Sequence, residues 1–277
     1  MIMVGQRNRS PPESALPPLK EKERSKMAAL KVFPDSEHLI QAAAETFVRV
    51  AAKAIAAQGR FSVALSGGST PRPLYALLGS EIFAGRIDWS RAHLFWGDER
   101  CVPPEDPRGN YHMVREILLK DIPLPPEHIH RIRGEDDPRS AAADYEREIR
   151  SFFDTPDGKP RTAFDLVLLG MGEDGHTASL FPGSPAIVEQ TRWVSAEYAE
   201  SVSMWRITLT PMLINSARNV LFLVSGAGKA KAVRDVLQGP FQPEKLPAQA
   251  IKPLKGRLTW LLDKAAAGGG EIPPREL

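Results

Sequence analysis

Apolar residues follow two different periods along the chain, and the two periods alternate from one segment to the next. Over Ser36–Gln58 the apolar side chains recur at three- and four-residue steps, and Gly59 follows as a helix stop. Phe61–Leu65 is a short apolar run that is typical of a strand buried on both faces. The same patterns predict further strands at residues 93–96, 164–169, 204–209, 220–224 and 258–262, and further helices at 71–78, 111–119, 141–153, 211–217 and 229–237.

This alternation of strands and helices indicates an α/β fold. It predicts a largely parallel sheet that is flanked by helices on both faces. The pattern begins after Met27, so residues 27–277 are expected to form a single α/β domain, with one long loop at residues 154–161. In such sheets ligands bind beyond the carboxyl ends of the strands, so we expect the functional residues in the loops that follow the strands.

Composition and charge indicate which kinds of molecule the protein is expected to bind. The chain has 277 residues and a mass of 30.5 kDa, and its apolar and charged fractions of 42% and 25% are those of an ordinary globular protein. There are 36 basic and 34 acidic residues, and the small basic excess lies in residues 1–26. Because nucleic-acid binding needs clustered positive charge, we expect no nucleic-acid partner. Any bound anion must be held by a few placed cations.

The cysteine content and the N-terminal segment give indications of where in the cell the protein is located. Cys101 is the only cysteine, which excludes an intramolecular disulfide and makes a reducing, cytoplasmic location the simplest expectation. No apolar run approaches the roughly 20 residues of a membrane helix, so no membrane partner is expected. Residues 1–26 are rich in proline and charge and predict a disordered leader. A misread extension before Met27 and a transit peptide are the alternatives, the second weakened by three glutamates.

Loops after four of the predicted strands carry unusual residues. The first follows Phe61–Leu65 and contains Gly67, Gly68, Ser69 and Thr70. Paired glycines let backbone amides approach an anion, and Thr70 is expected to cap the helix that follows. Free amides at the positive end of a helix form a phosphate site. A tight turn between a strand and a helix explains this segment equally well.

The second loop holds Asp98, Glu99 and Arg100 in consecutive positions. Taken alone, this triplet is best explained as an exposed charged turn whose local ion pair contributes little. The guanidinium of Arg100 is also a planar fork that matches a carboxylate or an oxyanion, which makes it a candidate ligand. Asn110 follows as the expected N-cap of the next helix.

The third loop, residues 170–177, combines three glycines and two carboxylates with His176. Its spacing fits neither a Walker loop, because His176 stands where a lysine is required, nor an EF-hand. An exposed histidine beside an aspartate, here Asp174, is a plausible general base near neutral pH. Most single histidines are structural, but a position between Gly-Asp-Gly and an expected helix start favours a functional role.

The remaining candidates are two cations, Arg206 and Lys229. Each alone is typical of a solvated surface charge. Together with residues 67–70 they are suited to surround one phosphate, with amides and hydroxyls on one side and two cations on the other. His128, His130 and Cys101 are assigned no role, and no metal site is predicted.

These motifs, taken in order, resemble the 6-phosphogluconolactonase family. The resemblance rests on Leu-Ser-Gly-Gly-Ser-Thr-Pro at residues 65–71, Trp-Gly-Asp-Glu-Arg at 96–100, Gly-Met-Gly-Glu-Asp-Gly-His-Thr-Ala-Ser-Leu-Phe-Pro at 170–182 and Arg-Ile-Thr-Leu-Thr at 206–210. It covers roughly residues 28–262. It implies a Rossmann-like, three-layer fold shared with glucosamine-6-phosphate deaminase and ribose-5-phosphate isomerase. It also implies hydrolysis of the sugar phosphate lactone 6-phosphoglucono-δ-lactone, in the oxidative pentose phosphate route, without a metal or organic cofactor.

The resemblance also implies roles for individual residues. His176 matches the general base, Asp174 is its neighbour in the motif, and Arg100 matches the electrostatic partner of the lactone. The residues that match the phosphate-binding set are Gly67, Gly68, Ser69, Thr70, Arg206 and Lys229. Asp98 and Asn110 are expected as further substrate contacts, the role of Asp98 being unassigned.

Two other functions are compatible with parts of this pattern. An aldose–ketose isomerase or deaminase of amino-sugar phosphates resembles the chain at Asp98 and at the Gly-Asp-Gly-His turn. The deaminase pattern carries a glutamate five residues after that histidine, where this chain has Phe181, which argues against deamination. A sugar-phosphate sensor joined to a DNA-binding unit would need a helix-turn-helix, for which the leader is too short and too rich in proline. The choice between monomer and homodimer stays open.

Overall fold

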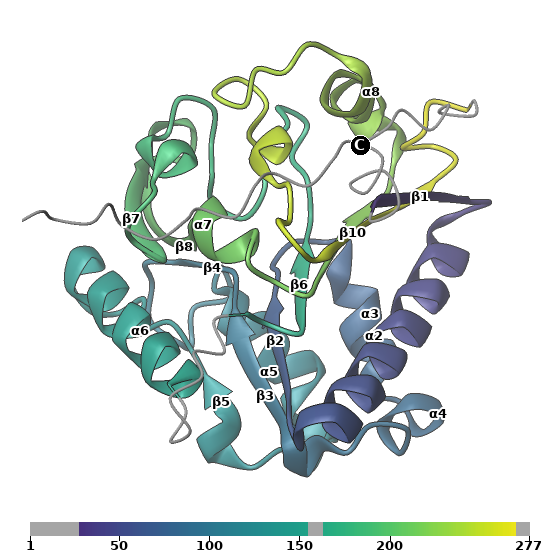
Figure 1. The fold of residues 1–277 in the computed structure, drawn as a ribbon, viewed down its shortest axis with the longest axis vertical. Helices are drawn as coiled ribbons and strands as arrows, with labels where there is room; N and C mark the ends of the chain where they lie inside the picture. The colour runs from purple at the N-terminus through teal and green to yellow at the C-terminus, as the bar shows by residue number, and fades with distance from the viewer. Residues whose placement is uncertain (1–27, 155–162, 270–277) are drawn as a thin grey trace, which may run out of the picture.

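The structure, a computed structural model, describes residues 28–154 and 163–269. Its centre is a sheet in the order β1-β10-β9-β6-β2-β3-β5, in which every neighbouring pair is parallel (Figure 1). The strands are β1 (Ala28–Phe33), β2 (Phe61–Leu65), β3 (Ala92–Trp96), β5 (Ile129–His130), β6 (Leu166–Leu169), β9 (Asn219–Val224) and β10 (Arg257–Asp263). The predicted α/β class with a largely parallel sheet is confirmed.

Helices cover the sheet on both faces. Helix α2 (Ser36–Gln58) packs on β1, β2 and β10. Helix α6 (Pro138–Phe153) lies across the sheet from α2 (Figure 1), where the Tyr145 hydroxyl accepts a hydrogen bond from the backbone N–H of Trp96 in β3 at 2.8 Å. The other α-helices of the described residues are α3 (Pro71–Gly79), α4 (Glu81–Ala84), α5 (Asn110–Ile117), α7 (Pro211–Ile214) and α8 (Ala230–Gln238). Because both faces are covered, all of β2 and β6 is buried within one continuous hydrophobic core.

The ends of α2 follow from local sequence signals. The side chain of Asp35 accepts a hydrogen bond from the backbone N–H of His38 at 2.9 Å and so caps the first turn. Gly59 adopts the left-handed conformation, with φ at 78°, and its N–H donates to the carbonyl of Ile55 at 2.8 Å. Both predicted boundaries of this helix are confirmed.

A second, antiparallel sheet was not predicted. It has the order β4-β8-β7 and consists of β4 (Asp98–Arg100), β8 (Met204–Leu209) and β7 (Val194–Ala199). The strand predicted at residues 204–209 therefore forms, but outside the parallel sheet. At Gly97 the chain leaves β3: the N–H of this residue still donates to the Leu65 carbonyl of β2, while its own carbonyl accepts from Leu209 of β8. This crossing carries Asp98, Glu99 and Arg100 out of the main sheet.

The order of the main sheet reverses between β2 and β6. From β2 the chain builds outward through β3 and β5, and from β6 it builds the other way through β9 and β10. The connections that leave the carboxyl ends of β2 and β6 therefore diverge and leave a crevice between them, which is where ligands bind in open α/β sheets. The strand order alone places residues 66–71 beside residues 170–177.

Some expectations concern residues that the structure does not describe. The leader at 1–26 lies outside the described residues, and so does nearly all of the loop expected at 154–161. The sequence pattern did not predict four of the strands, β1, β4, β5 and β7. Each of them is short or lacks a clear alternation of apolar and polar positions. Within the described residues, no helix is long and apolar enough to span a membrane.

Three histidines pack together at the edge of the main sheet. The ring centroids of His93 and His128 are 3.9 Å apart, and Nδ1 of His93 lies 3.1 Å from Nε2 of His130. Nδ1 of His130 lies 2.7 Å from Oε1 of Glu148. Burial, with His128, His130 and Arg60 nearby, lowers the pKa of His93 to about 3. This packing accounts for histidines to which the sequence pattern assigned no role.

We expect acid to destabilise the protein through His93. In the unfolded chain this imidazole takes up a proton near pH 6.5, whereas in the folded protein it stays neutral down to about pH 3. Between these values the unfolded state binds more protons, so the free energy of unfolding falls as the pH is lowered, by at most about 1.4 kcal/mol per pH unit.

Urea unfolding of the wild type and of His93→Gln, at about pH 7 and about pH 5, measures this contribution. The variant cannot take up this proton, so the wild type should lose more stability than the variant between the two pH values. An equal loss in both proteins would contradict the prediction.

Candidate active site

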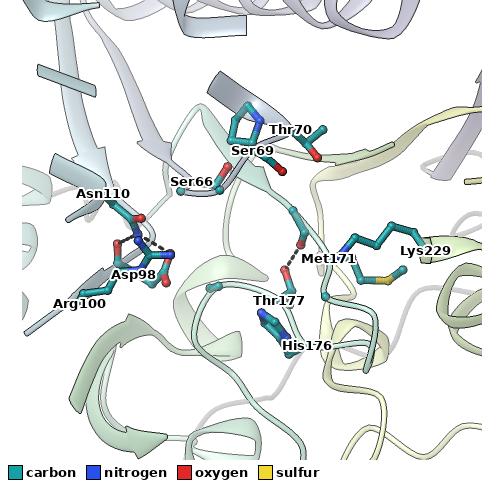
Figure 2. A pocket seen from close by; sticks show the side chains of 16 residues that line it. Ser66, Ser69, Thr70, Asp98, Arg100, Asn110, Met171, His176, Thr177 and Lys229 are labelled. Carbon is teal, nitrogen blue, oxygen red and sulfur yellow. Dashed lines mark hydrogen bonds between the residues drawn. The ribbon is translucent and has the colours of Figure 1, made fainter. Parts of the chain in front are cut away.

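A cavity of about 190 Å³ opens at the crevice between β2 and β6. It brings together loops from four regions of the chain: residues 66–71 after β2, 98–110 around β4, 170–178 after β6 and Lys229 after β9. Figure 2 shows Asp98, Arg100 and Asn110 on one side of the cavity, Lys229 on the other, and His176 facing the turn that carries Ser69. The predicted site residues that line it are Gly67, Gly68, Ser69, Thr70, Asp98, Arg100, Asn110, His176 and Lys229.

The first loop forms one wall of the cavity. Gly68 has φ at 97°, which a residue with a side chain adopts only with strain. The loop is held by Tyr75 of α3, whose hydroxyl donates to the Ser66 carbonyl at 2.7 Å and accepts from the Ser66 N–H at 3.0 Å. The side-chain cap expected from Thr70 is absent, since its hydroxyl makes no cap hydrogen bond. Thr70 already has helical dihedrals, whereas a capping residue usually has an extended backbone.

Asn110 connects this loop to β4. It is the first residue of α5 rather than its N-cap, so the predicted capping role is wrong. Its buried amide donates to the Asp98 carbonyl at 2.8 Å and lies 3.3 Å from Oδ1 of the same residue. A Cβ atom at Gly67 would overlap the Asn110 amide, so the close approach of the two loops requires glycine there.

Glu99 caps α5 from outside the helix. Its carboxylate accepts backbone hydrogen bonds from Asn110 and Tyr111, both at 2.6 Å, and from Arg100 at 2.8 Å. Burial raises the pKa of Glu99 to about 7, although these hydrogen bonds act to lower it, and the charge of the neighbouring Asp98 adds to the rise. The sequence pattern assigned Glu99 no role, because its partners lie eleven and twelve residues further along the chain.

Asp98 and Arg206 are buried next to Arg100. The carboxylate of Asp98 is 7% exposed and accepts a hydrogen bond from the Ser179 hydroxyl at 2.7 Å. Arg206 lies opposite Arg100 in the antiparallel pairing of β4 and β8, and its side chain is buried. Burial and the charge of Arg100 lower the pKa of Arg206, while Asp98 and Glu99 act in the opposite direction. Arg206 does not line the cavity, so its predicted direct contact with a phosphate is not supported by this placement.

His176 is held by Asp174 on one side and by Phe181 on the other. Its Nδ1 lies 2.6 Å from Oδ1 of Asp174, and its backbone N–H donates to the same oxygen at 3.1 Å. Burial opposes ionisation of Asp174, but the hydrogen bonds from His176 outweigh it and hold the pKa of this carboxyl below its ordinary value. The imidazole packs on Phe181, with ring centroids 4.5 Å apart.

The segment after His176 is not the helix start that was expected. Thr177 and Leu180 instead form an isolated antiparallel bridge, and Ala178 between them has φ at 49°. The Thr177 hydroxyl donates to the Gly170 carbonyl at 2.8 Å, which ties the two ends of the loop together. The tight turn therefore holds the imidazole at the cavity without a helix.

Lys229 is positioned by a buried carboxylate at the end of β10. Asp263 is 4% exposed and accepts from the Gly226 N–H at 3.1 Å, from the Ser225 hydroxyl and, at 2.7 Å, from the Ala266 N–H. These bonds fix the turn that follows β9, where Gly226 has φ at 101°. The lysine itself follows in a short 3-10 helix, Ala227–Lys229, and reaches the cavity.

The site offers a base, cations and backbone amides. Within residues 28–154 and 163–269, no group of three or more histidine, cysteine or acidic side chains is arranged to hold a metal ion. Cys101 is half-buried, and burial raises the pKa of its thiol to about 11, which disfavours the thiolate needed for nucleophilic attack. The arrangement is suited to proton transfer at a polar, anionic substrate.

The family description "glucosamine-6-phosphate isomerases/6-phosphogluconolactonase" matches residues 34–260. The chain belongs to this family. A 6-phosphogluconolactonase from Nostoc is 40% identical over 244 residues, which are 88% of this chain and 98% of that protein. The family resemblance inferred from the motifs is confirmed.

Solved structures show the same fold. The 6-phosphogluconolactonase from Trypanosoma cruzi has a TM-score of 0.76 at 31% identity, covering 88% of this chain and 97% of that one. A monomeric glucosamine-6-phosphate deaminase has a TM-score of 0.72 at 25% identity, covering 87% and 99%. Because both activities occur on one fold, the choice between them depends on the side chains of the site.

We expect Gly172→Ala to disrupt the His176–Asp174 pair without unfolding the protein. A Cβ atom at Gly172 would overlap Nδ1 of the imidazole and lie 2.5 Å from Oδ1 of Asp174. Asp174 would lose its hydrogen bonds but stay partly buried, so its pKa should rise. Carboxyl-detected NMR titration of Asp174 measures this change.

Gly170→Ala, in the same loop, is the matched control. A Cβ atom at Gly170 meets no atom within 4 Å, and the residue has no positive φ. The Asp174 pKa should match that of the wild type in this variant. A shift of equal size in both variants would show that the loop, rather than the specific overlap, is responsible.

Proposed function

We propose that this protein hydrolyses 6-phospho-D-glucono-1,5-lactone to 6-phospho-D-gluconate. The observation that carries the proposal is that His176 and Lys229, 53 residues apart in the sequence, line one cavity with the amide-rich loop of residues 67–70. The relatives named 6-phosphogluconolactonase support the same reaction, which belongs to the oxidative pentose phosphate pathway.

In the proposed mechanism His176 acts as general base. Nδ1 of the imidazole is engaged by Asp174, which favours the tautomer with a proton on Nδ1 and leaves Nε2 free to accept one. Nε2 takes a proton from a water molecule as that water attacks the lactone carbonyl carbon. The carbon–oxygen bond of the ring then breaks, and the ring oxygen leaves as a hydroxyl with the proton returned by the imidazolium.

Arg100 is proposed to stabilise the oxyanion. Its guanidinium lies at the cavity wall, held by a hydrogen bond from Nη1 to the Arg108 carbonyl. A fixed donor aimed at a developing oxyanion is worth about 2.7–4 kcal/mol of barrier lowering. Because the lactone is an activated ester, hydrolysis needs no covalent nucleophile.

The phosphate is proposed to bind between residues 67–70 and Lys229. The glycines and hydroxyls of this loop, at the start of α3, present donors from one side, and the lysine adds a charge from the other. Arg206 would act indirectly here, because it does not line the cavity, is paired with Arg100 across β4 and β8, and balances the buried charges of Asp98 and Glu99. The phosphate then positions the carbonyl for attack.

Deamination of an amino-sugar phosphate is the alternative that the fold itself allows. The ring of Phe181 lies against His176 at the position where the deaminase pattern has a glutamate. A phenyl ring cannot relay a proton, so this chain lacks that titratable group. Faster release of ammonia from glucosamine 6-phosphate than hydrolysis of the lactone would refute the proposal.

We expect His176→Ala to lower kcat by about 10²- to 10⁴-fold, because the variant loses its proton acceptor. The KM should change little, since the imidazole contributes mainly in the transition state. Lactone hydrolysis with spontaneous opening subtracted measures both constants. Unchanged kcat in a folded variant would exclude His176 as the base.

We expect Lys229→Ala to raise KM for the phosphorylated lactone by about 10- to 100-fold, the value of one charge-assisted hydrogen bond to the phosphate. The rate with unphosphorylated gluconolactone should be the same in the wild type and the variant. Equal use of both lactones by the wild type would contradict a phosphate-binding role for the cavity.

A further inference from the structure

A second recess opens beside the active-site cavity and shares part of its wall. It is lined by Gly68, Ser69, Arg100 and Asn110, which also line the first cavity, and additionally by Arg72 and Met113. Its volume is about 250 Å³. Two of the shared residues, Arg100 and Asn110, lie on the side of the first cavity opposite Lys229 (Figure 2), so the recess adjoins that side.

The charge of the recess favours an anion. Two arginines and no acidic residue occur among the described residues that line it. Arg108, in the loop beside it, is already neutralised by Asp106, whose carboxylate lies 2.6 Å from Nη2. Arg72 stands in the first turn of α3, and within the described part of the chain it makes no hydrogen bond or ion pair. Arg72 is therefore available to a ligand.

The proposed reaction creates an anion at this place. Water oxygen adds to the lactone carbonyl carbon, the ring carbon–oxygen bond breaks, and the new acid loses its proton to solvent, so a neutral ester becomes a carboxylate. The phosphate at the other end of the molecule is unchanged. The product is thus an open chain with an anionic group at each end, and the new group forms beside Arg100.

We propose that the recess receives the carboxylate of the open-chain product, with Arg72 and Arg100 as its two cations. The inference rests on the proposed function, which places the phosphate at Lys229 and the carbonyl at Arg100. Two guanidinium groups bind a carboxylate more tightly than a single guanidinium does, because each offers a planar pair of donors. Arg72 therefore sets how tightly the product is retained, while the ring form of the substrate, which has no carboxylate, gains less from it.

Isothermal titration calorimetry with two ligands tests this assignment. The first is 6-phosphogluconate, and the second is sorbitol 6-phosphate, which has the same chain and phosphate but an alcohol in place of the carboxylate. In Arg72→Ala, the Kd for 6-phosphogluconate should rise about fivefold, the upper end for an exposed ion pair, and this effect should shrink at high salt. The Kd for sorbitol 6-phosphate should not change.

Arg49→Ala is the matched control, since Arg49 is an exposed arginine on α2 that does not line the recess. Both ligands should bind this variant as they bind the wild type. Product inhibition of lactone hydrolysis should weaken in Arg72→Ala alone, in parallel with the Kd.

Two results would overturn the proposal. An unchanged Kd for 6-phosphogluconate in Arg72→Ala would mean that the recess does not bind the carboxylate. Equal weakening of both ligands would mean that Arg72 acts on the phosphate instead. Because calorimetry needs no turnover, a wild type that fails to hydrolyse the lactone but shows the selective Arg72 effect would refute the proposed reaction and leave the carboxylate site standing.

Discussion

The burial of Asp98 and Glu99 is the constraint on which the site depends. Both carboxylates are less than a tenth exposed, and removing a charge from water is costly unless hydrogen bonds and opposite charge replace the solvent. Glu99 is compensated by backbone N–H groups at the start of α5, and Asp98 by the Asn110 amide and the Ser179 hydroxyl. Meeting these requirements brings β4, α5 and the turn after His176 into one place.

The same constraint explains the arginines around the site. Arg206 is a buried cation beside these carboxylates, and its charge offsets theirs where water cannot. Arg100, next to it, is turned toward the cavity by the carbonyl of Arg108. One arginine therefore stabilises the structure of the site while the other is available to a ligand. The sequence motifs alone do not show which of the two arginines is structural and which can bind a ligand.

The cavity also depends on residues that have no side chain. Gly67 lets the first loop lie against Asn110, and Gly172 leaves the space in which His176 meets Asp174. Gly68 and Gly226 adopt backbone conformations that other residues adopt only with strain. Four loops approach one another closely at the point where the sheet order reverses. They can do so because these glycines carry no side chains that would fill the space between them.

Interactions between residues close together in the chain were enough to predict a large part of this protein. The period of apolar residues predicted α2 and β2 with their bounds, because amphipathic packing and local caps act within a few residues. The order of glycine, histidine and acidic motifs predicted the family and most of the residues that line the cavity. Where a side chain's partner is near in the chain, as for His176 and Asp174, the pattern was sufficient.

Features that depend on residues far apart in the chain could be found only in the folded protein. The departure of Asp98–Arg100 from β3 into an antiparallel sheet requires pairing with β8, about a hundred residues away. That pairing places the buried Arg206 opposite Arg100, and Glu99 rather than Asn110 supplies the hydrogen bonds that cap α5. The recess likewise joins Arg72 of α3 to Arg100 of β4, two residues 28 positions apart. Burial and long-range pairing are properties of the packed chain, so no local pattern of residues encodes them.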